Sequence, residues 1–469
     1  MRLLSINVGP DCSATVLKRG EVTFHLSAER ISRKKHDENI FEILEYLRAT
    51  DDLEFSDIII NDTNHNDEVL LRVEKFMADH FKFRKIDFNR NDSHLSKAYC
   101  GFFNSSFDKA LCFVSNELVY TADRKSIREI FKIDRDSIGP KFSRLAQEFG
   151  FEYNGASKIM NLSQCLGYEV ELDPKWREMV DRSYDLQRES ESEVIRMIEK
   201  YSKETGINNI VLTGGYALNC VANSKFKKEF PHLNFFIDPL CSDSIGQAYK
   251  YYKENSFFRK KIKPLKKAYI GTPLKYDGLD PEHCTPLHGA VYEDMLHTTS
   301  RIIGHGHPVA IAQGRSEGGY RALGNRSILL DPRRASGKEF LNNLKGRENF
   351  RPFGATILQE YVNYWFDFEG ESSHMQYVAK RKSHWNSDVI THVDGTCCIQ
   401  TLTKEQNYHY YRLIEDFYYI TGVPMVLNTS LNYTGEPIAE TLDQIVESLV
   451  KLGVHHLYLP EEEILVKIH

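Results

Sequence analysis

The sequence predicts an α/β protein of two domains, and three observations support this. In the N-terminal half, short β-branched and leucine-rich runs alternate with stretches of helical apolar spacing. A charged, proline-containing stretch at 257–290 interrupts this pattern, and a second set of strand-like and helix-like runs follows it. The chain has 469 residues, which is enough for about two to four domains. We therefore expect domains at 1–260 and 291–469, joined by a linker at 261–290.

The first two elements are predicted from local signals. Residues 1–9, MRLLSINVG, form a strand-like run that ends on a glycine. Residues 14–29 follow as two apolar runs separated by Arg19-Gly20, a dipeptide typical of a tight turn. We expect a strand and then a β-hairpin.

The next elements repeat this pattern and add a helix. Residues 109–121 predict a second hairpin that turns at Ser115-Asn116, and residues 190–206 have helical apolar spacing. Residues 208–230 then give an apolar strand, a Gly-Gly turn and a helix. Hairpin, hairpin and strand–Gly-Gly–helix is an order typical of a mixed-sheet nucleotide-binding fold of the actin/hexokinase kind.

Composition and charge exclude several classes of protein. A net charge of −6 argues against nucleic-acid binding by the whole surface and leaves one local basic run, FFRKKIKPLKKAY, at 257–269. No apolar window approaches the ~20 residues that span a bilayer, and the first residues lack the pattern of a secretory signal. The nine cysteines form no CxxC pair, and no internal sequence repeat is visible. We expect a cytoplasmic protein without a membrane segment, and the sequence leaves open whether it forms a homo-oligomer.

Three polar segments of the N-terminal half lie where strands are predicted to end, which is where ligands bind in open α/β sheets. In NVGPDCSA, Asp11 offers a carboxylate for acid–base chemistry, or alternatively an Asx-type turn. In LTGGYALN, the Gly214-Gly215 turn opens a helix and suits a phosphate or adenylate bound by backbone N–H groups. In DPLCSDSIGQA, Asp243 lies at a predicted helix start, where it contacts a ligand or caps the helix.

The C-terminal half concentrates charged residues between glycines. The set comprises Arg315, Glu317, Arg321, Arg326, Lys345, Arg347 and Arg351. Arginine forks match phosphate oxygens bidentately, and a lysine adds a point charge. In LKGRENFRPFG, we expect Glu348 to orient one of the arginines, and in GVPMVLNTSLNYTGEP the polar Ser430 and Asn432 follow an apolar strand. Together these segments predict an anion pocket.

Seven collinear segments resemble the O-carbamoyltransferase family, which includes nodulation protein U and the tobramycin and cephamycin carbamoyltransferases. The segments are AERISRKKHD (28–37), NGASKIMNLS (154–163), GGYALNCVAN (214–223), RALGNRSILLDPR (321–333), KGRENFRPF (345–353), DGTCCIQT (394–401) and LNTSLNYTGEP (427–437). The resemblance implies an N-terminal actin-like (ASKHA) domain, similar to the tRNA threonylcarbamoyl transferase, and a C-terminal YrdC-like domain. It further implies that ATP, Mg²⁺ and carbamoyl phosphate yield carbamoyl adenylate in the C-terminal domain. The N-terminal domain then passes the carbamoyl group to an acceptor hydroxyl.

The resemblance assigns roles to the polar residues. Carbamoyl phosphate and ATP are expected to bind Arg315, Glu317, Arg321, Lys345, Arg347, Arg351, Ser430 and Asn432. The adenylate is expected to bind the N-terminal domain at Gly214, Gly215 and Asn219. Transfer of the carbamoyl group is expected to depend on Asp11, Lys97 and Asp243.

One departure from the family pattern concerns a metal. Family members carry a metal site built from H-x-x-x-H, an Asp in the following hairpin and a later Asp. Here Ser93 and Lys97 stand at the two histidine positions, with His94 beside the first, and the hairpin position near Ser115 has no Asp. Only Asp243 remains, whereas Fe, Mn or Zn sites need about three protein ligands. We expect the iron-type site to be lost and Lys97 to pair with Asp243 and supply the positive charge; alternatively, Lys97 points to solvent.

Two further departures concern the donor and the acceptor. Cys398 stands where relatives have an arginine that is expected to help hold carbamoyl phosphate, and GPD replaces the usual Gly-His-Asp, so that Pro10 occupies the middle position. Two alternatives to the carbamoyltransferase therefore stay open: a transferase with another acyl donor, and a non-catalytic nucleotide-binding paralogue that pairs with an active partner. The acceptor is a small molecule such as a sugar or natural product. Alternatively, because basic residues interleaved with aromatics suit a nucleic-acid strand, it is a hydroxymethylated pyrimidine in a nucleotide or in DNA.

Overall fold

The structure is a computed structural model that describes ten segments of the chain. They are residues 1–9, 12–50, 53–63, 66–90, 93–133, 138–151, 155–167, 174–255, 261–287 and 294–469. Asp11, Pro10 and the start of the basic run at 257–269 therefore lie outside the described residues.

The chain divides into two compact units. The first comprises Met1–Ser137, Met197–Leu218 and Phe230–Thr272, and the second comprises Ile138–Arg196, Asn219–Glu229 and Pro273–His469. Both units combine helices with sheets, so the predicted α/β class is confirmed. The expected functional domains at 1–260 and 291–469 stay a prediction.

The first unit contains two five-stranded sheets of the same topology. One has the order β3 (Glu21–Ser27), β2 (Ser13–Lys18), β1 (Arg2–Val8), β4 (Asp57–Asp62) and β5 (Lys85–Asn89). The other has the order β8 (Ile127–Lys132), β7 (Leu118–Asp123), β6 (Lys109–Val114), β9 (Asn209–Thr213) and β10 (Asn234–Ile237). In the spatial order given for each sheet, the first three strands pair antiparallel with one another. The last two strands run parallel to the third strand of that order. The unit is therefore a structural duplication.

Both predicted hairpins are confirmed, and their turns explain why the sequence signal was strong. Arg19 and Gly20 have φ values of 53° and 81°, and Ser115 and Asn116 have φ values of 52° and 63°. Two consecutive residues with positive φ make the two-residue turn that matches the twist of antiparallel strands. The predicted strand–Gly-Gly–helix is also present, as β9, a 3₁₀ helix η1 (Gly215–Leu218) and α8 (Cys220–Glu229).

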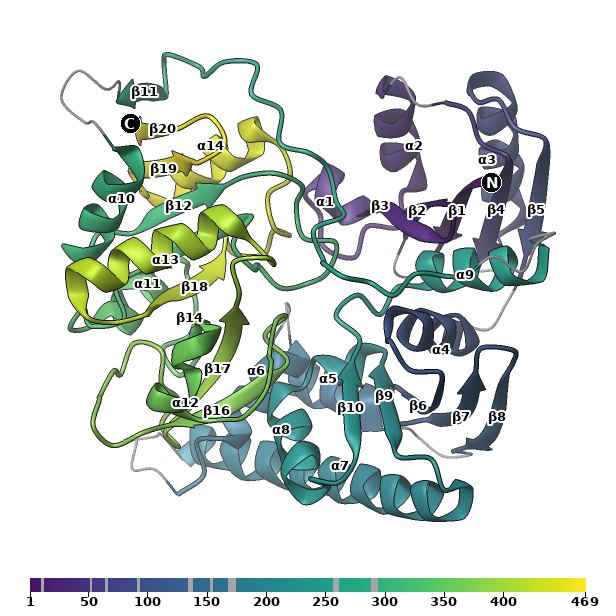
Figure 1. The fold of residues 1–469 in the computed structure, drawn as a ribbon, viewed down its shortest axis with the longest axis horizontal. Helices are drawn as coiled ribbons and strands as arrows, with labels where there is room; N and C mark the ends of the chain where they lie inside the picture. The colour runs from purple at the N-terminus through teal and green to yellow at the C-terminus, as the bar shows by residue number, and fades with distance from the viewer. Residues whose placement is uncertain are drawn as a thin grey trace. The chain divides into compact units, whose positions relative to one another are not determined.

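Five α-helices lie wholly within the described part of the first unit. They are α1 (Ala28–Ser32), α2 (Ile40–Ala49), α3 (Asp67–His80), α4 (Ser93–Asn104) and α9 (Asp243–Asn255). Helix α9 packs on β1, β2 and β4 of one sheet, and α4 packs on β6, β7 and β9 of the other. The two helices also pack on each other, so both lie between the sheets (Figure 1).

The crossing of α4 and α9 requires a glycine. A Cβ on Gly246 of α9 would lie 2.5 Å from the carbonyl carbon of Ser96 and still closer to its oxygen. These are backbone atoms, which cannot move aside as the end of a side chain can. Gly246→Ala should therefore lower the free energy of unfolding by roughly 1–3 kcal/mol, because overpacking forces the backbone to shift. Urea unfolding measures this; Gly304→Ala, whose Cβ would meet only side-chain atoms at 3.6 Å or more, is the control. Equal stability of the two variants would contradict the close crossing.

The second unit is built on one ten-stranded sheet. Its strands, in spatial order, are β11 (Cys284–Leu287), β20 (Ile464–Ile468), β19 (His456–Leu459), β12 (Val309–Ala312), β13 (Arg326–Leu330), β18 (Met425–Ser430), β14 (Gly354–Leu358), β17 (Thr396–Leu402), β16 (Tyr377–Arg381) and β15 (Phe366–Asp367). Its helices are α5 (Ile138–Glu148), α6 (Gly155–Ser163), α8, α10 (Met295–Gly304), α11 (Gly337–Leu344), η2 (Gln359–Tyr361), α12 (Val362–Trp365), α13 (Tyr408–Thr421) and α14 (Leu442–Leu452). Helix α7 (Pro174–Thr205) contributes to both units, and it is longer than the helix predicted at 190–206.

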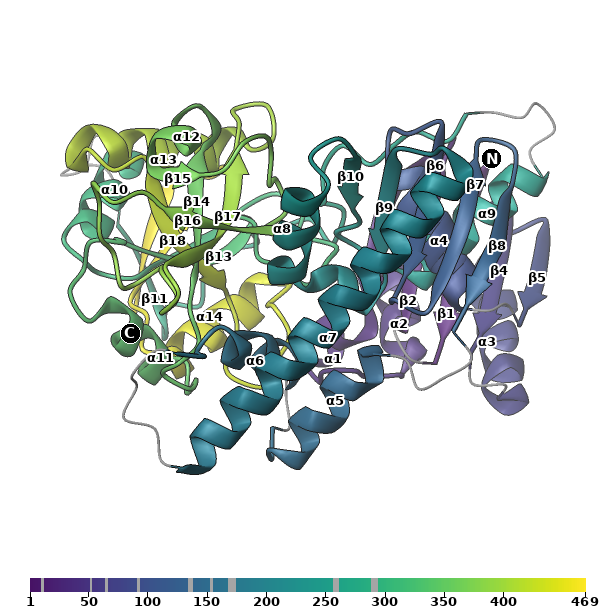
Figure 2. The ribbon, with the colours of Figure 1, turned by 90° about the horizontal axis from the view of Figure 1, so that it is seen from below.

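The central strand β12 shows how the sheet of the second unit is covered. Val309 and Ile311 lie in the core that contains residues of α10 and α13, whereas Ala310 and Ala312 lie in the core that contains residues of α14. Alternate residues of a strand point to opposite faces, so an all-apolar strand predicts a sheet buried on both sides. Figure 2 shows α13 and α14 on either side of the strands. None of the helices in the described part of the chain combines the length and the apolar character of a membrane span.

Candidate active site

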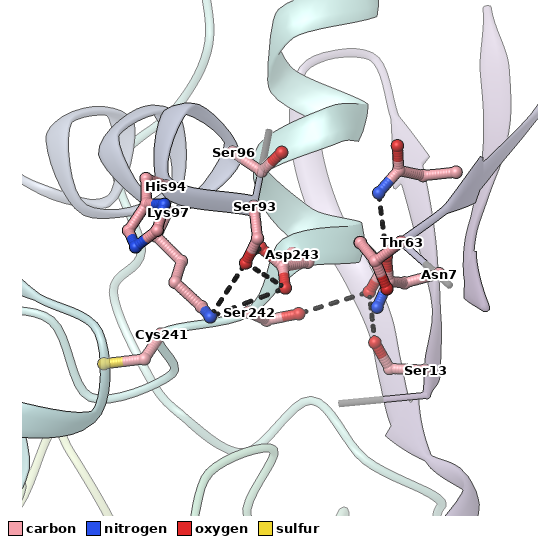
Figure 3. Close-up of polar contacts among 12 residues, drawn as sticks. Asn7, Ser13, Thr63, Ser93, His94, Ser96, Lys97, Cys241, Ser242 and Asp243 are labelled. Atoms are coloured by element: carbon pink, nitrogen blue, oxygen red, sulfur yellow. Dashed lines mark hydrogen bonds and ion pairs between the residues drawn. The ribbon is translucent and has the colours of Figure 1, made fainter. Parts of the chain in front are cut away.

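The first polar cluster of interest joins α4 to the start of α9. Lys97 Nζ lies 3.6 Å from Asp243 Oδ2, and only 16% of the Lys97 side chain is exposed. Ser93 Oγ donates to the Asp243 carboxylate at 2.9–3.0 Å and accepts a hydrogen bond from Lys97 Nζ at 2.9 Å (Figure 3). The structure thus brings Lys97 and Asp243 together, and Lys97 does not point to solvent.

The local sequence explains this geometry. Ser93 and Lys97 are four residues apart on α4, so their side chains lie on the same face of the helix. Asp243 is the first residue of α9, where free N–H groups and the helix dipole favour a negative charge. Asp243 is 1% exposed, and a carboxylate buried to this extent needs charged or hydrogen-bonding partners. Lys97 and Ser93 provide them.

A separate chain of hydroxyl groups begins at Ser242, the residue before Asp243 in the sequence, and leads to β2. Ser242 Oγ lies 3.2 Å from Ser244 Oγ, which in turn lies 2.9 Å from Ser13 Oγ and 2.7 Å from Thr15 Oγ1. His25 Nδ1 is 2.9 Å from Thr15 Oγ1, and burial, followed by the charge of Arg30, lowers the pKa of His25 to about 3. A neutral imidazole therefore ends the chain. The sequence did not predict this network, because its members come from distant segments of the chain.

The residues at the family's metal position do not fit a metal ion. The Asp243 carboxylate is engaged by an ammonium and a hydroxyl, and a cation placed beside Lys97 would be repelled. His94 Nε2 lies 3.0 Å from Glu117 Oε2 of the β6–β7 connection, an interaction that the sequence did not predict. Within the described residues, side chains with metal-ligating atoms gather as a group of three only at an exposed turn, Asp280, Glu282 and His283.

The predicted adenylate-binding glycines form a tight turn after β9. Gly214 has φ +81°, and its Cβ position is filled by Ser115 of the β6–β7 turn. A Cβ on Gly215, by contrast, would meet open space. Asn219 belongs to the second unit, where its Oδ1 accepts from Ala222 N at 3.0 Å and its Nδ2 donates to Gln187 at 2.9 Å. Asn219 therefore caps α8, whether or not it also contacts a nucleotide.

The second polar cluster is a group of arginines in the second unit. Burial lowers the pKa of Arg347 well below its usual value, and the charges of Arg351 and Arg321 lower it further. Burial also lowers the pKa of Arg351, against the attraction of Glu348. The Nε atoms of Arg347 and Arg351 are buried and have no hydrogen-bond partner within the described residues. We call Arg321, Arg347 and Arg351 the arginine cluster; an anion would relieve its mutual repulsion.

Glu348 and the aromatic residues around it hold the arginine cluster in place. The Glu348 carboxylate lies 2.5 Å from Lys158 Nζ of α6 and 3.7 Å from Arg351 Nη1, so it orients an arginine as expected and a lysine as well. The pKa of Glu348 is lowered despite burial, because it accepts a hydrogen bond from Lys158. Arg347 Cζ lies 4.5 Å from the centre of the Phe353 ring, a favourable cation–π distance. The alternation of charged and aromatic residues in LKGRENFRPFG follows from these contacts.

Lys345, Ser430 and Asn432 also come together. Lys345 follows α11 and is 3% exposed. Its Nζ donates to Ser430 O at 2.5 Å and Asn432 Oδ1 at 3.0 Å, with Asn432 O at 3.3 Å and Ser430 Oγ at 3.4 Å. The lysine charge is therefore fixed at the end of β18, where the sequence predicted polar residues at a strand end.

Arg326 requires a correction, because the sequence placed it in the anion pocket. It is fully buried, and its guanidinium donates to the backbone carbonyls of Gln313 (2.7 Å), Asn325 (2.8 Å), Glu440 (3.3 Å) and Gly314 (3.4 Å). A side chain saturated in this way is a structural support. Glu317 also supports the backbone: its Oε1 accepts hydrogen bonds from the backbone N–H groups of Leu323, Asn325 and Arg326, at 2.7–3.3 Å.

A buried network of side-chain amides supports the loop that carries Arg321. Three successive loop carbonyls, those of Ala322, Leu323 and Gly324, accept from Asn428 (3.1 Å), Gln400 (3.1 Å) and Gln313 (2.9 Å). Asn407 links to the same loop through Asn325 at 2.8 Å, and Asn325 donates to the carbonyl of Arg315 at 2.6 Å. The network fixes the backbone on both sides of Arg321. Buried Asn and Gln within otherwise apolar strands were the signal that the sequence offered for it.

The two α/β units thus carry a lysine–aspartate cluster in the first and the arginine cluster in the second. The family model described as "Carbamoyltransferase N-terminus" matches residues 174–249, and the one described as "Carbamoyltransferase C-terminus" matches residues 300–467. Together they account for just over half of the chain. The chain belongs to the carbamoyltransferase family.

Individual relatives agree with this assignment. The chain is 28% identical to nodulation protein NolNO of Sinorhizobium fredii, over 76% of this chain and 61% of that protein. It is 30% identical to the 3'-hydroxymethylcephem-O-carbamoyltransferase of Streptomyces clavuligerus, over 50% of this chain and 45% of that enzyme. An uncharacterized protein of Methanocaldococcus jannaschii, MJ1051, is 26% identical over 97% of this chain and 98% of its own. The chain thus spans about half to three fifths of the length of the two named relatives.

Solved structures give weaker likenesses. A ROK family protein from Streptococcus pneumoniae is matched over 54% of this chain and 99% of its own, with 10% identity and a TM-score of 0.34. Full-length HypF is matched over 36% of this chain and 21% of its own, with 16% identity and a TM-score of 0.28. At these scores neither likeness defines the arrangement of the chain.

Proposed function

We propose that this protein is an ATP-dependent O-carbamoyltransferase. In a first step, water cleaves carbamoyl phosphate into carbamate and inorganic phosphate, and the carbamate attacks the α-phosphorus of ATP, which gives carbamoyl adenylate and releases pyrophosphate. In a second step, the carbamoyl group passes to the hydroxyl of an acceptor and AMP leaves. The observation that carries the proposal is the arginine cluster. Neighbouring positive charge acts on Arg347 and Arg351, and their buried Nε atoms have no hydrogen-bond partner among the described residues, which suits the phosphates of ATP and carbamoyl phosphate.

In the first step the residues of the second unit compensate the negative charge of the phosphates. Arg321, Arg347 and Arg351 neutralise the phosphates, together with the Mg²⁺ that accompanies ATP. Lys345 adds a fixed positive charge at the end of β18, next to Ser430 and Asn432. Arg315 and Glu317 lie on the loop before Arg321; there, we expect Arg315 to contact an anion and Glu317 to shape the backbone.

In the second step the residues of the first unit act without a metal. Lys97 supplies positive charge to the carbonyl oxygen of the carbamoyl group as the acceptor attacks, and Asp243 and Ser93 hold the ammonium in place. Asp11 is proposed as the base that takes the acceptor proton. Gly214 and Gly215 offer backbone N–H groups to the adenylate.

The acceptor is proposed to be a hydroxymethyl group. The name of one relative, 3'-hydroxymethylcephem-O-carbamoyltransferase, describes a hydroxymethylated acceptor, which supports this class of acceptor. Both a hydroxymethylated small molecule and a hydroxymethylated pyrimidine in a nucleotide or in DNA belong to it.

The first step is tested by measuring pyrophosphate release from ATP, Mg²⁺ and carbamoyl phosphate without an acceptor. Release should depend on carbamoyl phosphate and should fall on the order of 10²-fold or more in Arg351→Ala, because a guanidinium that contacts the reacting phosphates is lost. Arg412→Ala is the control: Arg412 pairs with Glu415 on the exposed face of α13, so its loss should leave the rate unchanged. Release that persists in Arg351→Ala would contradict the assignment.

A second candidate function is a transferase with another acyl donor. It is favoured by Cys398, which stands where the family pattern has an arginine and whose thiol forms a hydrogen bond with Cys220. Pyrophosphate release that requires a donor other than carbamoyl phosphate would support it. ATP binding without release for any donor would instead support a non-catalytic nucleotide-binding paralogue.

A further inference from the structure

Two cysteines of the second unit, far apart in the sequence, are held side by side by backbone contacts. Cys220 is the first residue of α8, and Ser224 lies one helical turn further on. The Ser224 hydroxyl donates to Val378 O at 2.9 Å and accepts from Val378 N at 2.8 Å. Val378 on β16 is the direct partner of Cys398 on β17. The start of α8 is therefore fixed on the strand beside Cys398.

The two thiols contact each other, and their surroundings separate their charges. A hydrogen bond from Cys398 lowers the pKa of Cys220 to about 7, against the effect of burial, with help from the Arg321 charge and from backbone N–H groups at the start of α8. The same hydrogen bond, together with burial, raises the pKa of Cys398 well above its usual value. These surroundings favour the thiolate at Cys220 and the thiol at Cys398. The Cys398 Sγ also lies 3.6 Å from the carbonyl oxygen of Met375.

The remaining cysteines differ from Cys220 in the direction of their pKa shift. Burial raises the pKa of Cys12, Cys100, Cys112, Cys165, Cys241, Cys284 and Cys397. Cys397 is adjacent to Cys398, but successive side chains of a strand point to opposite faces, and the Cys397 thiol donates to a backbone carbonyl at 3.4 Å. Such thiols are inert toward oxidants, since the thiolate is the nucleophile.

We propose that Cys220 and Cys398 form a reactive dithiol site that a peroxide converts into a disulfide. The Cys220 thiolate attacks one oxygen of hydrogen peroxide, the O–O bond breaks, and with one proton the products are Cys220 sulfenic acid and water. The Cys398 sulfur then attacks the Cys220 sulfur and displaces a second water, its own proton going to the leaving oxygen. The two sulfurs lose two electrons in total and the peroxide gains them.

The burial of the pair selects the oxidant. Cys220 is 3% exposed, and Cys398 is half-buried, so a small uncharged peroxide fits better than a bulky disulfide. Because Arg321 belongs to both the arginine cluster and the thiolate's surroundings, oxidation would change the charge balance next to the anion site. This consequence depends on the proposed function, whereas disulfide formation does not.

The test is to treat the reduced full-length protein with hydrogen peroxide and to map disulfides by mass spectrometry without reduction. The linked peptides should contain Cys220 and Cys398, in the wild type and in the control Cys397→Ser. Cys398→Ser should stop at a sulfenic acid on Cys220 that dimedone traps, and Cys220→Ser should give neither product. No Cys220–Cys398 link in the wild type, or a link through Cys397, would overturn the proposal.

The pH profile of the same reaction gives a readout that needs no variant. The rate of disulfide formation in the wild type should rise with pH and level off above about 7, where Cys220 is mostly thiolate. A rate that keeps rising tenfold per pH unit through pH 9 would show an ordinary thiol and would contradict the assignment of Cys220 as the attacking group.

Discussion

Lys97→Ala should abolish carbamoyl transfer while leaving pyrophosphate release within about two-fold of the wild-type rate. Lys97 contributes its charge in the first unit, next to Asp243, whereas the arginine cluster lies in the second unit. Loss of an electrostatic stabiliser costs on the order of 10²–10³ in rate. The measurement follows labelled carbamoyl groups into a hydroxymethyl cephem and a hydroxymethylated pyrimidine nucleotide, beside pyrophosphate release from the same preparation. Unchanged transfer would refute the role of Lys97.

Companion variants separate charge from packing. Lys97→Arg keeps the positive charge and should retain part of the transfer rate, whereas Lys97→Met keeps most of the volume and should lose it. Because Asp243 is 1% exposed, Lys97→Ala also leaves a buried carboxylate with less compensation. Normal pyrophosphate release in that variant shows that the second unit is intact, and circular dichroism with a thermal melt checks the whole chain.

A double variant tests whether lysine has replaced the family's metal. Ser93→His with Lys97→His restores the H-x-x-x-H spacing on α4, and Asp243 offers a third ligand. We expect this variant to bind about one Fe²⁺ or Mn²⁺ per chain, measured by elemental analysis after desalting, and the wild type to bind none tightly. Equal metal content in the two proteins would contradict the replacement.

The parts of the fold that the sequence predicted are those that depend on neighbouring residues. Arg19-Gly20 and Ser115-Asn116 specify their hairpins through the backbone conformation of two adjacent residues, so a local pattern was sufficient. The duplication of the two five-stranded sheets was not visible, because strand order depends on pairing between distant segments. The hydrogen bond between Ser13 and Ser244 spans 231 positions for the same reason.

The candidate site was predictable in residue type but not in orientation. Both Arg326 and Arg347 lie in glycine-rich segments, and the sequence treated them alike. In the structure Arg326 is fully buried and saturated by backbone carbonyls, whereas Arg347 has a buried Nε without a partner among the described residues. The sequence also did not predict the ion pair between Lys158 and Glu348, because Lys158 lies on another helix, α6. Which cation supports the fold and which meets a ligand is decided by tertiary packing.

Arg347→Met should raise the melting temperature of the ligand-free protein and abolish pyrophosphate release. The pKa of Arg347 is lowered by burial and by the charges of Arg351 and Arg321, so the charge destabilises the empty protein. Methionine preserves packing on Phe353, and removal of the charge should stabilise by about 1 kcal/mol, or about 2–4 °C. Scanning fluorimetry measures the melting temperature with and without ATP, whose stabilisation of the wild type should disappear in the variant, and a pyrophosphate assay measures release. Arg412→Met should change neither quantity. A destabilised Arg347→Met that still releases pyrophosphate would show that this guanidinium is a packing group, and the anion site would then have to lie elsewhere.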